Sequence, residues 1–309
     1  MERRKFIRNT TAATVIAGTT LWSNSALASG IFTSPTLIKG TKKITILHTN
    51  DTHSHIEPVS GGRSDGKGGV ARRAAIINRV REENPNTILL DCGDIFQGTP
   101  YFNFYGGELE IKLMSMMGYD AATIGNHDFD NGIEGLYEQL PHASFDFVIS
   151  NYDVSNTILD GYVKKTKVII KDGVRIGLFG VGIELKGLVD PKMYKETVYL
   201  DPVSVAQDMV KKLREEEKCD LVICMSHLGY SYREDKISDL KLASLTSGID
   251  LIIGGHTHTF LDKPAIVKNA VDKDVMVNQV GCYGINLGRI DFMLERGAVS
   301  GVSDVVYEV

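Results

Sequence analysis

Residues 124–130 have the sequence Ile124-Gly125-Asn126-His127-Asp128-Phe129-Asp130. This stretch ends an apolar run and, after a glycine, places an amide, an imidazole and two carboxylates close together. So many polar groups are atypical of a core strand, because core side chains are mostly apolar. One interpretation is a turn with a helix cap, in which Asn or Asp side chains accept hydrogen bonds from backbone N–H groups. The rest of the sequence has to decide between that cap and a functional site.

Four other apolar runs of the chain also end in residues that can bind a metal ion. With the first stretch included, these residues are Asp51 and His53, Asp94, Asn126 with His127, His227, and His256 with His258. In open α/β sheets, ligands bind outside the carboxyl ends of the strands. Five strand ends can therefore converge on one site, although their residues are up to about 200 positions apart in sequence.

The positions of the eight histidines support this interpretation. A single histidine at the end of a strand more often has a surface or capping role. Five histidines lie at these strand ends, which makes that role improbable for the whole set. We keep the surface or capping interpretation for the other three, which are His48, His55 and His142.

Strands alternate with segments of helical periodicity along the chain. Helices are expected over residues 70–83, 108–117, 133–139, 202–217 and 240–246. An Asp172-Gly173 turn joins two β-rich runs in a hairpin. We expect loops over residues 61–69 and 99–107, and several short strands between residues 275 and 306. This order predicts an α/β fold with mixed sheets.

The ligand types indicate the kind of metal and the reaction. Carboxylates, imidazoles and one amide oxygen suit Zn²⁺, Mn²⁺ or Fe²⁺, and the lack of thiolates argues against a closed structural zinc site. One ion rarely needs seven protein ligands. Two divalent ions about 3.5–4 Å apart would use them all and would clamp the oxygens of an in-line displacement. The sequence therefore predicts hydrolysis of a phosphate ester.

Five segments in this order resemble those of a known family. They are Asp51-Thr52-His53, Gly93-Asp94, Gly125-Asn126-His127-Asp128, His227 after a strand, and Gly255-His256-Thr257-His258. The set resembles the calcineurin-like metallophosphoesterases over roughly residues 43–295. Three longer segments, Leu47–His53, Asp94–Gly98 and Gly125–Asp130, are similar to the exported 5′-nucleotidase branch. The resemblance implies a four-layer α/β/β/α sandwich with two mixed β-sheets.

The resemblance also implies a role for each residue of the site. One ion would be bound by Asp51, His53 and His258, and the other by Asn126, His227 and His256, with Asp94 bridging the two. His127 would lie beside the ions and contact the substrate together with Asn126, and Asp130 would hold the tautomer of His127.

The reaction implied is in-line attack of a metal-bridged hydroxide on the phosphate of a nucleotide, with His127 assisting. Asp128 is expected only to cap the following helical turn. Replacing it by Asn is therefore expected to cost little activity.

The 5′-nucleotidase branch usually has a second, C-terminal domain whose aromatic residues bind the nucleoside. This sequence ends at Val309, so we expect a catalytic domain over residues 43–309 without that second domain. The substrate is then small, or the loops 61–69 and 99–107 replace the missing contacts, or a separate nucleotide-binding polypeptide supplies them. Four aromatic residues of the second loop either stack on the substrate or pack on the domain surface: Tyr101, Phe102, Phe104 and Tyr105.

Other functions remain open at this point. The same ligands would serve a phosphodiesterase acting on cyclic or sugar nucleotides. A related thiosulfohydrolase branch is also exported and ranks third. A catalytic subunit that is inactive without a nucleotide-binding partner is a further alternative.

The N-terminus is typical of a twin-arginine signal peptide over residues 1–28. Arg3-Arg4 precedes a weakly apolar run, and Ala26-Leu27-Ala28 forms a small-x-small cleavage site. That run is shorter than the about 20 apolar residues that span a bilayer. Residues 29–42 are expected to form a flexible leader. We therefore expect a protein exported by the twin-arginine route to the periplasm or beyond, and not held in a membrane.

Charge and cysteine content exclude other classes of protein. Removal of residues 1–28 leaves 30 basic and 38 acidic residues, which gives a net negative charge. Nucleic acid is also negatively charged, so this surface is not suited to bind it. The four cysteines are not arranged in CxxC pairs, and no structural disulfide is expected among them. They are Cys92, Cys219, Cys224 and Cys282.

Overall fold

The structure is a computed structural model that describes residues 40–309. The expected signal peptide and residues 29–39 of the expected leader lie outside the described residues. Strand β1 spans Thr41–Thr49, so Thr41 and Lys42 belong to a sheet and not to a leader. Within residues 40–309, no helix is both long enough and apolar enough to cross a bilayer.

The first of two large sheets contains β1 and the strands that follow it along the chain. Strands β1 to β4 run parallel to one another, whereas β13 pairs antiparallel with β1 and β14 pairs antiparallel with β13, so the sheet is mixed. In spatial order its strands are β14 (Ala298–Glu308), β13 (Asn286–Glu295), β1, β2 (Thr87–Asp91), β3 (Ala121–Ala122) and β4 (Asp146–Phe147).

The second large sheet is also mixed. Its four central strands run parallel, and each edge strand is antiparallel to its neighbour. In spatial order the strands are β11 (Ala265–Lys268), β12 (Asp274–Asn278), β10 (Leu251–Ile253), β9 (Leu221–His227), β7 (Val174–Gly182) and β6 (Thr166–Lys171). A separate pair consists of β5 (Tyr152–Asp153) and β8 (Val198–Tyr199).

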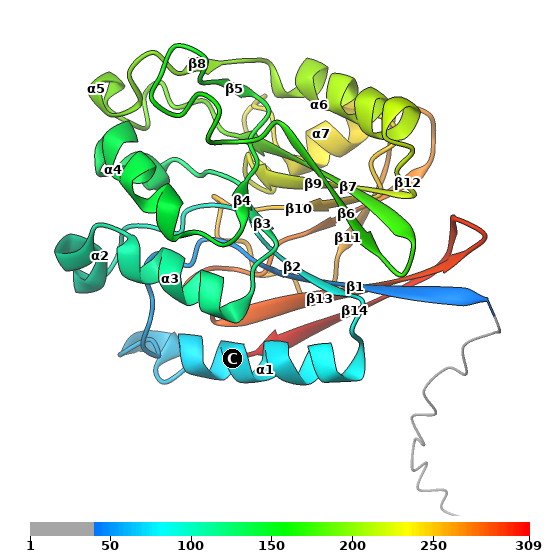
Figure 1. Ribbon diagram of the computed structural model, residues 1–309, viewed down its shortest axis with the longest axis horizontal. Helices are drawn as coiled ribbons and strands as arrows, with labels where there is room; N and C mark the ends of the chain where they lie inside the picture. The colour runs from blue at the N-terminus through cyan, green and yellow to red at the C-terminus, as the bar shows by residue number, and fades with distance from the viewer. Residues whose placement is uncertain (1–39) are drawn as a thin grey trace, which may run out of the picture. The chain divides into compact units, whose positions relative to one another are not determined.

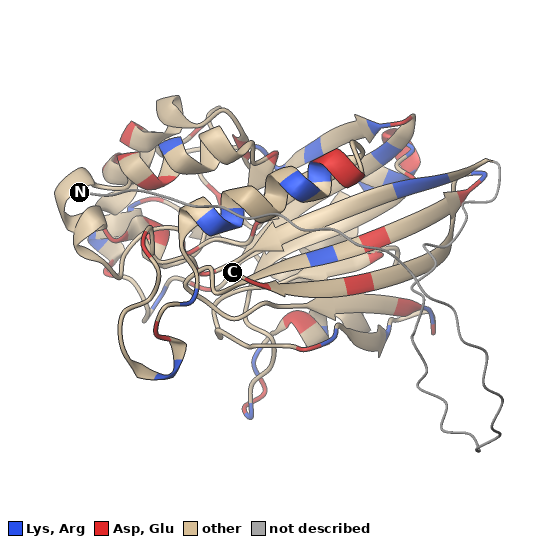
Figure 2. Ribbon diagram, turned by 90° about the horizontal axis from the view of Figure 1, so that it is seen from below, with Lys and Arg blue, Asp and Glu red and all other residues tan. Residues whose placement is uncertain are grey.

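Helices cover the outer faces of both sheets (Figure 1). Those packed on the first sheet include α1 (Val70–Glu83), α3 (Glu108–Met117) and α4 (Gly132–Gln139). Seen from below, α1 lies across the strands of that sheet and contains several basic residues (Figure 2), of which Arg72 and Arg79 are exposed and Arg73 is buried. The second sheet is covered by α6 (Pro202–Lys211) and α7 (Asp239–Leu245). The remaining short α-helices are α2 (Pro100–Tyr105) and α5 (Pro191–Tyr194), and single 3-10 turns form η1 (Gly62–Ser64), η2 (His127–Phe129) and η3 (Leu140–His142).

Three buried clusters of apolar side chains hold these layers together. Side chains alternate between the two faces of a strand, so Leu89 of β2 packs toward the helices while Leu90 packs toward the second sheet. The cluster between the sheets joins Leu90 to residues such as Ile223 of β9. A third cluster lies between the second sheet and α6 and α7. The expected four-layer α/β/β/α sandwich with two mixed sheets is confirmed.

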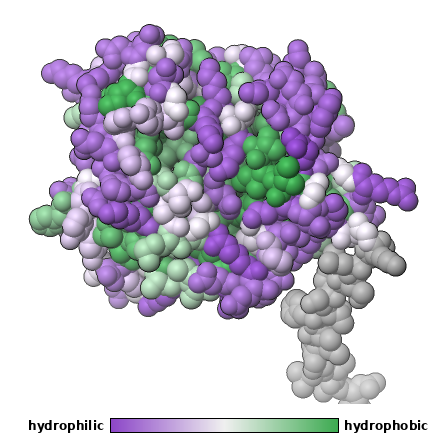
Figure 3. Space-filling view, viewed as in Figure 1, coloured by the Kyte–Doolittle hydropathy of each residue, from purple (hydrophilic) through white to green (hydrophobic). Residues whose placement is uncertain are grey.

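Because most apolar side chains are buried, few of them remain on the surface. The face seen in Figure 1 is largely hydrophilic, with an apolar patch where β6 lies at the front (Figure 3). Ile170 is among the exposed apolar residues and lies on β6, which is an edge strand of the second sheet. All four cysteines are buried and free.

Several expectations for single elements were wrong. Residues 100–105 form α2 and not a loop, because Pro100 occupies its first position and Thr99 Oγ1 accepts a hydrogen bond from the backbone N of Tyr101. The helix expected to reach residue 217 ends at Lys211, and a π-helical turn follows over Lys212–Glu216. Of the several short strands expected between residues 275 and 306, only β12 is short, and it is followed by two long paired strands, β13 and β14.

His48 is fully buried, so a surface role is wrong for it. It lies on β1 facing the second sheet, and its Nε2 is 2.9 Å from Asn278 Nδ2 of β12. Gly288 lies directly opposite on β13, where a Cβ atom would come within 2.2 Å of the imidazole. The imidazole therefore fills a space that a glycine leaves between the sheets.

Candidate metal centre

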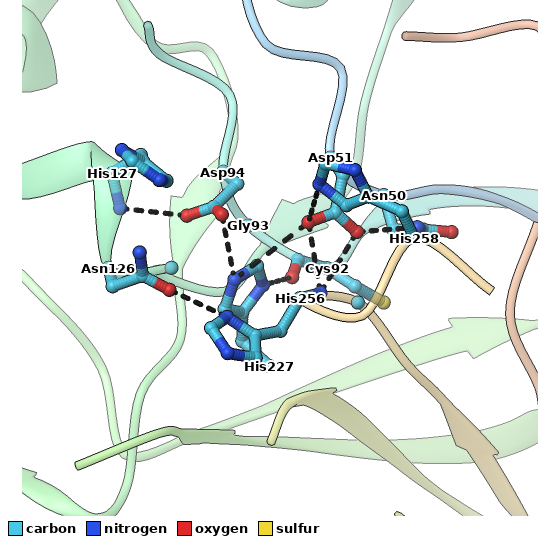
Figure 4. Close-up of polar contacts among 12 residues, drawn as sticks. Asn50, Asp51, Cys92, Gly93, Asp94, Asn126, His127, His227, His256 and His258 are labelled. Atoms are coloured by element: carbon cyan, nitrogen blue, oxygen red, sulfur yellow. Dashed lines mark hydrogen bonds and ion pairs between the residues drawn. The ribbon is translucent and has the colours of Figure 1, made fainter. Parts of the chain in front are cut away.

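The seven residues expected to bind metal come together at one edge of the sandwich, and all of them except His53 are labelled in Figure 4. The first sheet supplies Asp51 and His53 after β1, Asp94 after β2 and Asn126 after β3. The second sheet supplies His227, the last residue of β9, and His256 and His258 after β10. All of these lie at the carboxyl ends of parallel strands, which is where ligands bind in such sheets.

The first group of ligand atoms consists of Asp51, His53 and His258, which could hold one metal ion. His53 Nε2 lies 3.0 Å from His258 Nε2, and His258 Nε2 lies 3.4 Å from Asp51 Oδ1. The Nδ1 atom of His53 faces the carbonyl oxygen of Phe96 at 3.2 Å. A proton on that Nδ1 leaves a lone pair on Nε2, pointing at the other two ligand atoms.

The second group consists of Asp94, His227 and His256, with Asn126 beside it. His227 Nε2 is 3.1 Å from Asp94 Oδ2, and His256 Nδ1 is 2.8 Å from Asn126 Oδ1. The Nδ1 atom of His227 faces the carbonyl oxygen of Cys92 at 2.6 Å, which again leaves Nε2 free to bind a metal.

Asp94 lies between the two groups. Its Oδ2 atom is 3.1 Å from Nε2 of His227 in the second group and 3.8 Å from Nε2 of His53 in the first. Its other oxygen, Oδ1, accepts a hydrogen bond from the backbone N of His127 at 2.8 Å. One oxygen therefore positions the loop after β3, while the other faces both groups of ligands.

The donor set of both groups fits divalent cations. Lone pairs of imidazole nitrogens and carboxylate oxygens converge there, and the fully buried Nε2 of His227 has no hydrogen bond of good geometry. Burial lowers the pKa of His227, but the carboxylates of Asp94 and Asp51 outweigh it and raise this pKa to about 10. A hydrogen bond to Asp51 likewise raises the pKa of His258 to about 10. Metal ions on deprotonated imidazoles would supply the positive charge that these carboxylates attract.

The ligands sit on strained backbone. Five of the seven have positive φ angles, a region that residues other than glycine seldom adopt. They are Asp51 (50°), His53 (45°), Asp94 (54°), His256 (73°) and His258 (50°). Such conformations cost about 1–3 kcal/mol each and cluster at functional sites, where the surrounding structure maintains them.

His127 and Asp130 form a pair beside the two groups. His127 Nδ1 and Asp130 Oδ2 are 2.9 Å apart, and both side chains are partly exposed. The hydrogen bond to Asp130 raises the pKa of His127. With Nδ1–H donating to Asp130, the Nε2 atom of His127 is available to a ligand in the cavity.

The expected capping role of Asp128 is wrong. Its carboxylate is buried and caps no helix. It accepts hydrogen bonds from the backbone N of Asp94 at 3.1 Å, Ile95 at 2.9 Å, Phe96 at 3.2 Å and Gly125 at 2.8 Å. Asp128 therefore joins the loop after β2 to the loop after β3.

A cavity of about 440 Å³ opens over the ligands. Besides five of the expected ligands and His127, it is lined by four residues that the sequence analysis did not assign to the site: His55, Gln97, Gly98 and Tyr283. Tyr283 follows β12, which runs parallel to β10, so its place after a sixth strand end could have revealed it. His55 could have been found only from its contact with Tyr283.

The four aromatic residues considered for stacking differ in their positions. Phe102 is buried against Phe96, with ring centroids 5.4 Å apart, and so cannot stack on a substrate. Phe104 and Tyr105 are exposed, and Tyr101 lines a neighbouring cavity. The loop 61–69 lines neither cavity and is bound to the C-terminus, where Gly68 N donates to the Val309 carbonyl at 2.7 Å.

Comparison with protein families shows one match over most of the described residues. Residues 44–260 match the sequence model of the family described as Calcineurin-like phosphoesterase. This range contains all seven expected ligands together with His127 and Asp130.

Individual proteins are similar over more than four fifths of this chain. The trifunctional nucleotide phosphoesterase protein YfkN of Bacillus subtilis (strain 168) is 37% identical in an alignment of 289 positions that covers 83% of this chain and 18% of that protein. Snake venom 5′-nucleotidase of Gloydius brevicauda is 33% identical in an alignment of 279 positions that covers 83% of this chain and 46% of that protein.

A solved structure agrees with these relatives. The 5′-nucleotidase precursor from Thermus thermophilus superposes with a TM-score of 0.78 at 34% identity, covering 87% of this chain and 55% of that one. The chain spans about half the length of the two 5′-nucleotidases, and a smaller share of the Bacillus protein.

Proposed function

Because the chain belongs to the calcineurin-like phosphoesterase family and is related to 5′-nucleotidases, we propose that it hydrolyses nucleoside 5′-monophosphates. The chain is a metal-dependent phosphoric ester hydrolase, which follows from the family and from its relatives. The observation that carries the proposal is the position of Asp94, whose Oδ2 atom faces His227 at 3.1 Å and His53 at 3.8 Å. One shared carboxylate between two ligand groups is the arrangement that a pair of divalent ions requires.

The two ions are of the Zn²⁺, Mn²⁺ or Fe²⁺ class, from the ligand types. Asp51, His53 and His258 would hold one, and His227, His256 and Asn126 the other, with Asp94 shared. When bound, such ions lower the pKa of a water and neutralise charge on the phosphate oxygens.

The protein's own residues bind and orient the phosphate ester. Asn126 and His127 line the cavity, so their side chains contact phosphate oxygens there. The Nδ1–H of His127 donates to Asp130 at 2.9 Å, which directs Nε2 toward the substrate. A raised pKa favours the protonated form of His127, which stabilises charge on the phosphate oxygens or gives a proton to the leaving oxygen.

Export by the twin-arginine route is part of the proposal. It rests on the Arg3-Arg4 pair and the Ala26-Leu27-Ala28 site, which lie outside the described residues. Expression in a bacterial host with and without its twin-arginine translocase tests it. We expect a mature periplasmic form only in the first host, and equal periplasmic amounts in both hosts would contradict the route.

A hydrolysis panel tests the substrate class. The purified protein is treated with EDTA, supplied with Mn²⁺, Zn²⁺ or Fe²⁺, and assayed with 5′-AMP, other nucleoside monophosphates, a sugar nucleotide and bis(p-nitrophenyl) phosphate. We expect EDTA to abolish the activity, metal to restore it, and monophosphates to be the best substrates. Preferential cleavage of the diesters would establish the phosphodiesterase alternative in place of the proposal. Activity that appears only with a second polypeptide would favour the catalytic-subunit alternative.

A further inference from the structure

A second cavity lies beside the metal centre and shares part of its wall. We call it the outer cavity. Its volume is about 410 Å³, and it is lined on one side by residues 55–60 and on the other by residues 98–101. His55 and Gly98 line both cavities. Two adjoining cavities of about this size are large enough for a small-molecule substrate that extends beyond its phosphate.

The wall between the cavities is held in place by close packing and hydrogen bonds. A Cβ atom on Gly98 would lie 2.8 Å from the carbonyl oxygen of His53, so the backbone there rests directly on a metal ligand. Thr99 Oγ1 donates to the carbonyl oxygen of Ser54 at 2.8 Å, and Ser54 Oγ donates to the buried carboxylate of Glu110. The outer cavity is therefore preorganised, which lowers the entropic cost of filling it.

His55 lines both cavities, and its ring is backed by Tyr283, which lines only the cavity over the metal ligands. The rings of His55 and Tyr283 are stacked with centroids 4.1 Å apart and an interplanar angle of 27°. His55 Nδ1 donates to the carbonyl oxygen of His53 at 2.8 Å, which fixes the ring and leaves its Nε2 atom as an acceptor. A planar ring entering the outer cavity can extend this stack.

Two polar side chains, Glu57 and Tyr101, lie on opposite sides of the outer cavity, whose lining also includes apolar residues such as Val59. Tyr101 Oη is 3.5 Å from Glu57 Oε1, a long hydrogen bond that joins the two sides. Glu57 is exposed, so its carboxylate is free to accept further hydrogen bonds. No Lys or Arg of residues 40–309 lines either cavity. This lining suits a neutral group with hydroxyl donors and disfavours further phosphates.

The geometry points to the outer cavity as the binding site for the leaving group, and to a ribonucleoside as that group. Its base stacks against the aromatic residues His55 and Tyr101, and its ribose hydroxyls donate to the carboxylate of Glu57. Tyr101 and Glu57 then determine which leaving group the protein accepts, although neither residue is a metal ligand. The inference rests on the proposed function and adds to it where the nucleoside is bound.

Binding of adenosine, the product of AMP hydrolysis, tests this inference without relying on catalysis. Isothermal titration of the purified protein with adenosine is carried out for the wild type, Tyr101→Phe, Tyr101→Ala and Tyr105→Ala. Loss of one base-stacking ring typically weakens binding about tenfold or more. We therefore expect Tyr101→Ala to bind at least tenfold more weakly and Tyr101→Phe to stay close to the wild type. Tyr105 is an exposed tyrosine of the same helix outside the cavity, so Tyr105→Ala is the matched control.

A second comparison tests the contact with the ribose. The wild type should bind adenosine about tenfold more tightly than 2′,3′-dideoxyadenosine, because hydrogen bonds to a charged group contribute most of that difference. Glu57→Gln should reduce this preference, whereas Glu82→Gln, on the exposed end of α1, should leave it unchanged. Equal binding of the two nucleosides by the wild type would overturn the role of Glu57.

The outcomes separate this inference from the proposed function. One outcome is a wild type that hydrolyses AMP with metal and yet binds no adenosine, and another is a Tyr101→Ala variant that hydrolyses AMP and binds adenosine normally. Either result would overturn the outer cavity as the nucleoside site and leave the proposed phosphatase activity in place. Adenosine binding that depends on Tyr101, together with no hydrolysis of any phosphate ester, would overturn the proposed function while supporting the binding site.

Discussion

The carboxylate of Asp128 accepts a hydrogen bond from the backbone N of Asp94 at 3.1 Å. The same carboxylate also accepts from three further backbone N–H groups of the loops after β2 and β3. Asp94 in turn accepts from the backbone N of His127 at 2.8 Å. The two loops are thus linked in both directions, and the conformation of the shared metal ligand depends on a residue that binds no metal.

We expect Asp128→Asn to destabilise the protein and to lower its metal content. An amide has only one acceptor atom, so its NH₂ group would face backbone N–H groups that the carboxylate now satisfies. Leaving buried donors without partners costs about 1–3 kcal/mol. The free energy of unfolding and the metal content of dialysed protein check this. The exposed Asp160 gives the matched control, Asp160→Asn, and equal values for the two variants would contradict the role of Asp128.

Much of the fold and of the site could be predicted because the relevant signals are local. Continuous apolar runs mark β2, β9 and β10, and the polar residues that follow each strand are adjacent to it in sequence. The rule that parallel strands present their carboxyl ends at one edge then brings these residues together. Within one sheet, the expected convergence of ligands such as Asp51 and Asp94 needed no knowledge of which strands are neighbours.

The rest depended on contacts between distant residues, which no local pattern reveals. The role of Asp128 arises from backbone N–H groups more than 30 positions earlier in the chain. The burial of His48 requires the glycine at position 288 and a partner at position 278. His55 appears as a surface residue until Tyr283 is placed against it. The positive φ angles of the ligands likewise come from tertiary packing, because none of these residues is a glycine.

His127→Ala should lower kcat by about 10²–10⁴-fold, the usual contribution of a general acid or base. Metal content should stay at that of the wild type, because His127 belongs to neither ligand group. Asp130→Asn should cause a smaller loss, since the hydrogen bond to His127 Nδ1 is weakened and not removed. Steady-state kinetics with 5′-AMP and metal analysis on the same samples measure both effects. A His127→Ala protein that had lost a metal ion would show that His127 is a ligand.

Removal of the shared carboxylate should affect both metal ions. We expect Asp94→Ala to reduce the metal content from two ions per chain toward none, whereas His258→Ala should lose one ion. The reason is that Asp94 Oδ2 faces both ligand groups, while His258 faces only the first. Metal content after dialysis against a weak chelator measures this. Identical stoichiometries for the two variants would contradict a bridging position for Asp94.

Protonation of His48 should make the stability of the protein depend on pH. Burial lowers the pKa of His48 to about 3, compared with 6.5 for an unperturbed histidine. The folded state thus keeps the imidazole neutral, while the unfolded chain binds a proton as the pH falls below 6.5. The stabilising contribution is complete above pH 6.5 and is lost between that value and about 3, by up to roughly 1.4 kcal/mol per pH unit.

A variant without this imidazole tests the dependence on pH. We expect the free energy of unfolding of the wild type to fall more steeply between pH 7 and pH 5 than that of His48→Gln. His142→Gln, at a partly exposed histidine, should keep the slope of the wild type. Denaturant titrations at several pH values give these slopes, and parallel curves for the wild type and His48→Gln would show that His48 is not the group responsible.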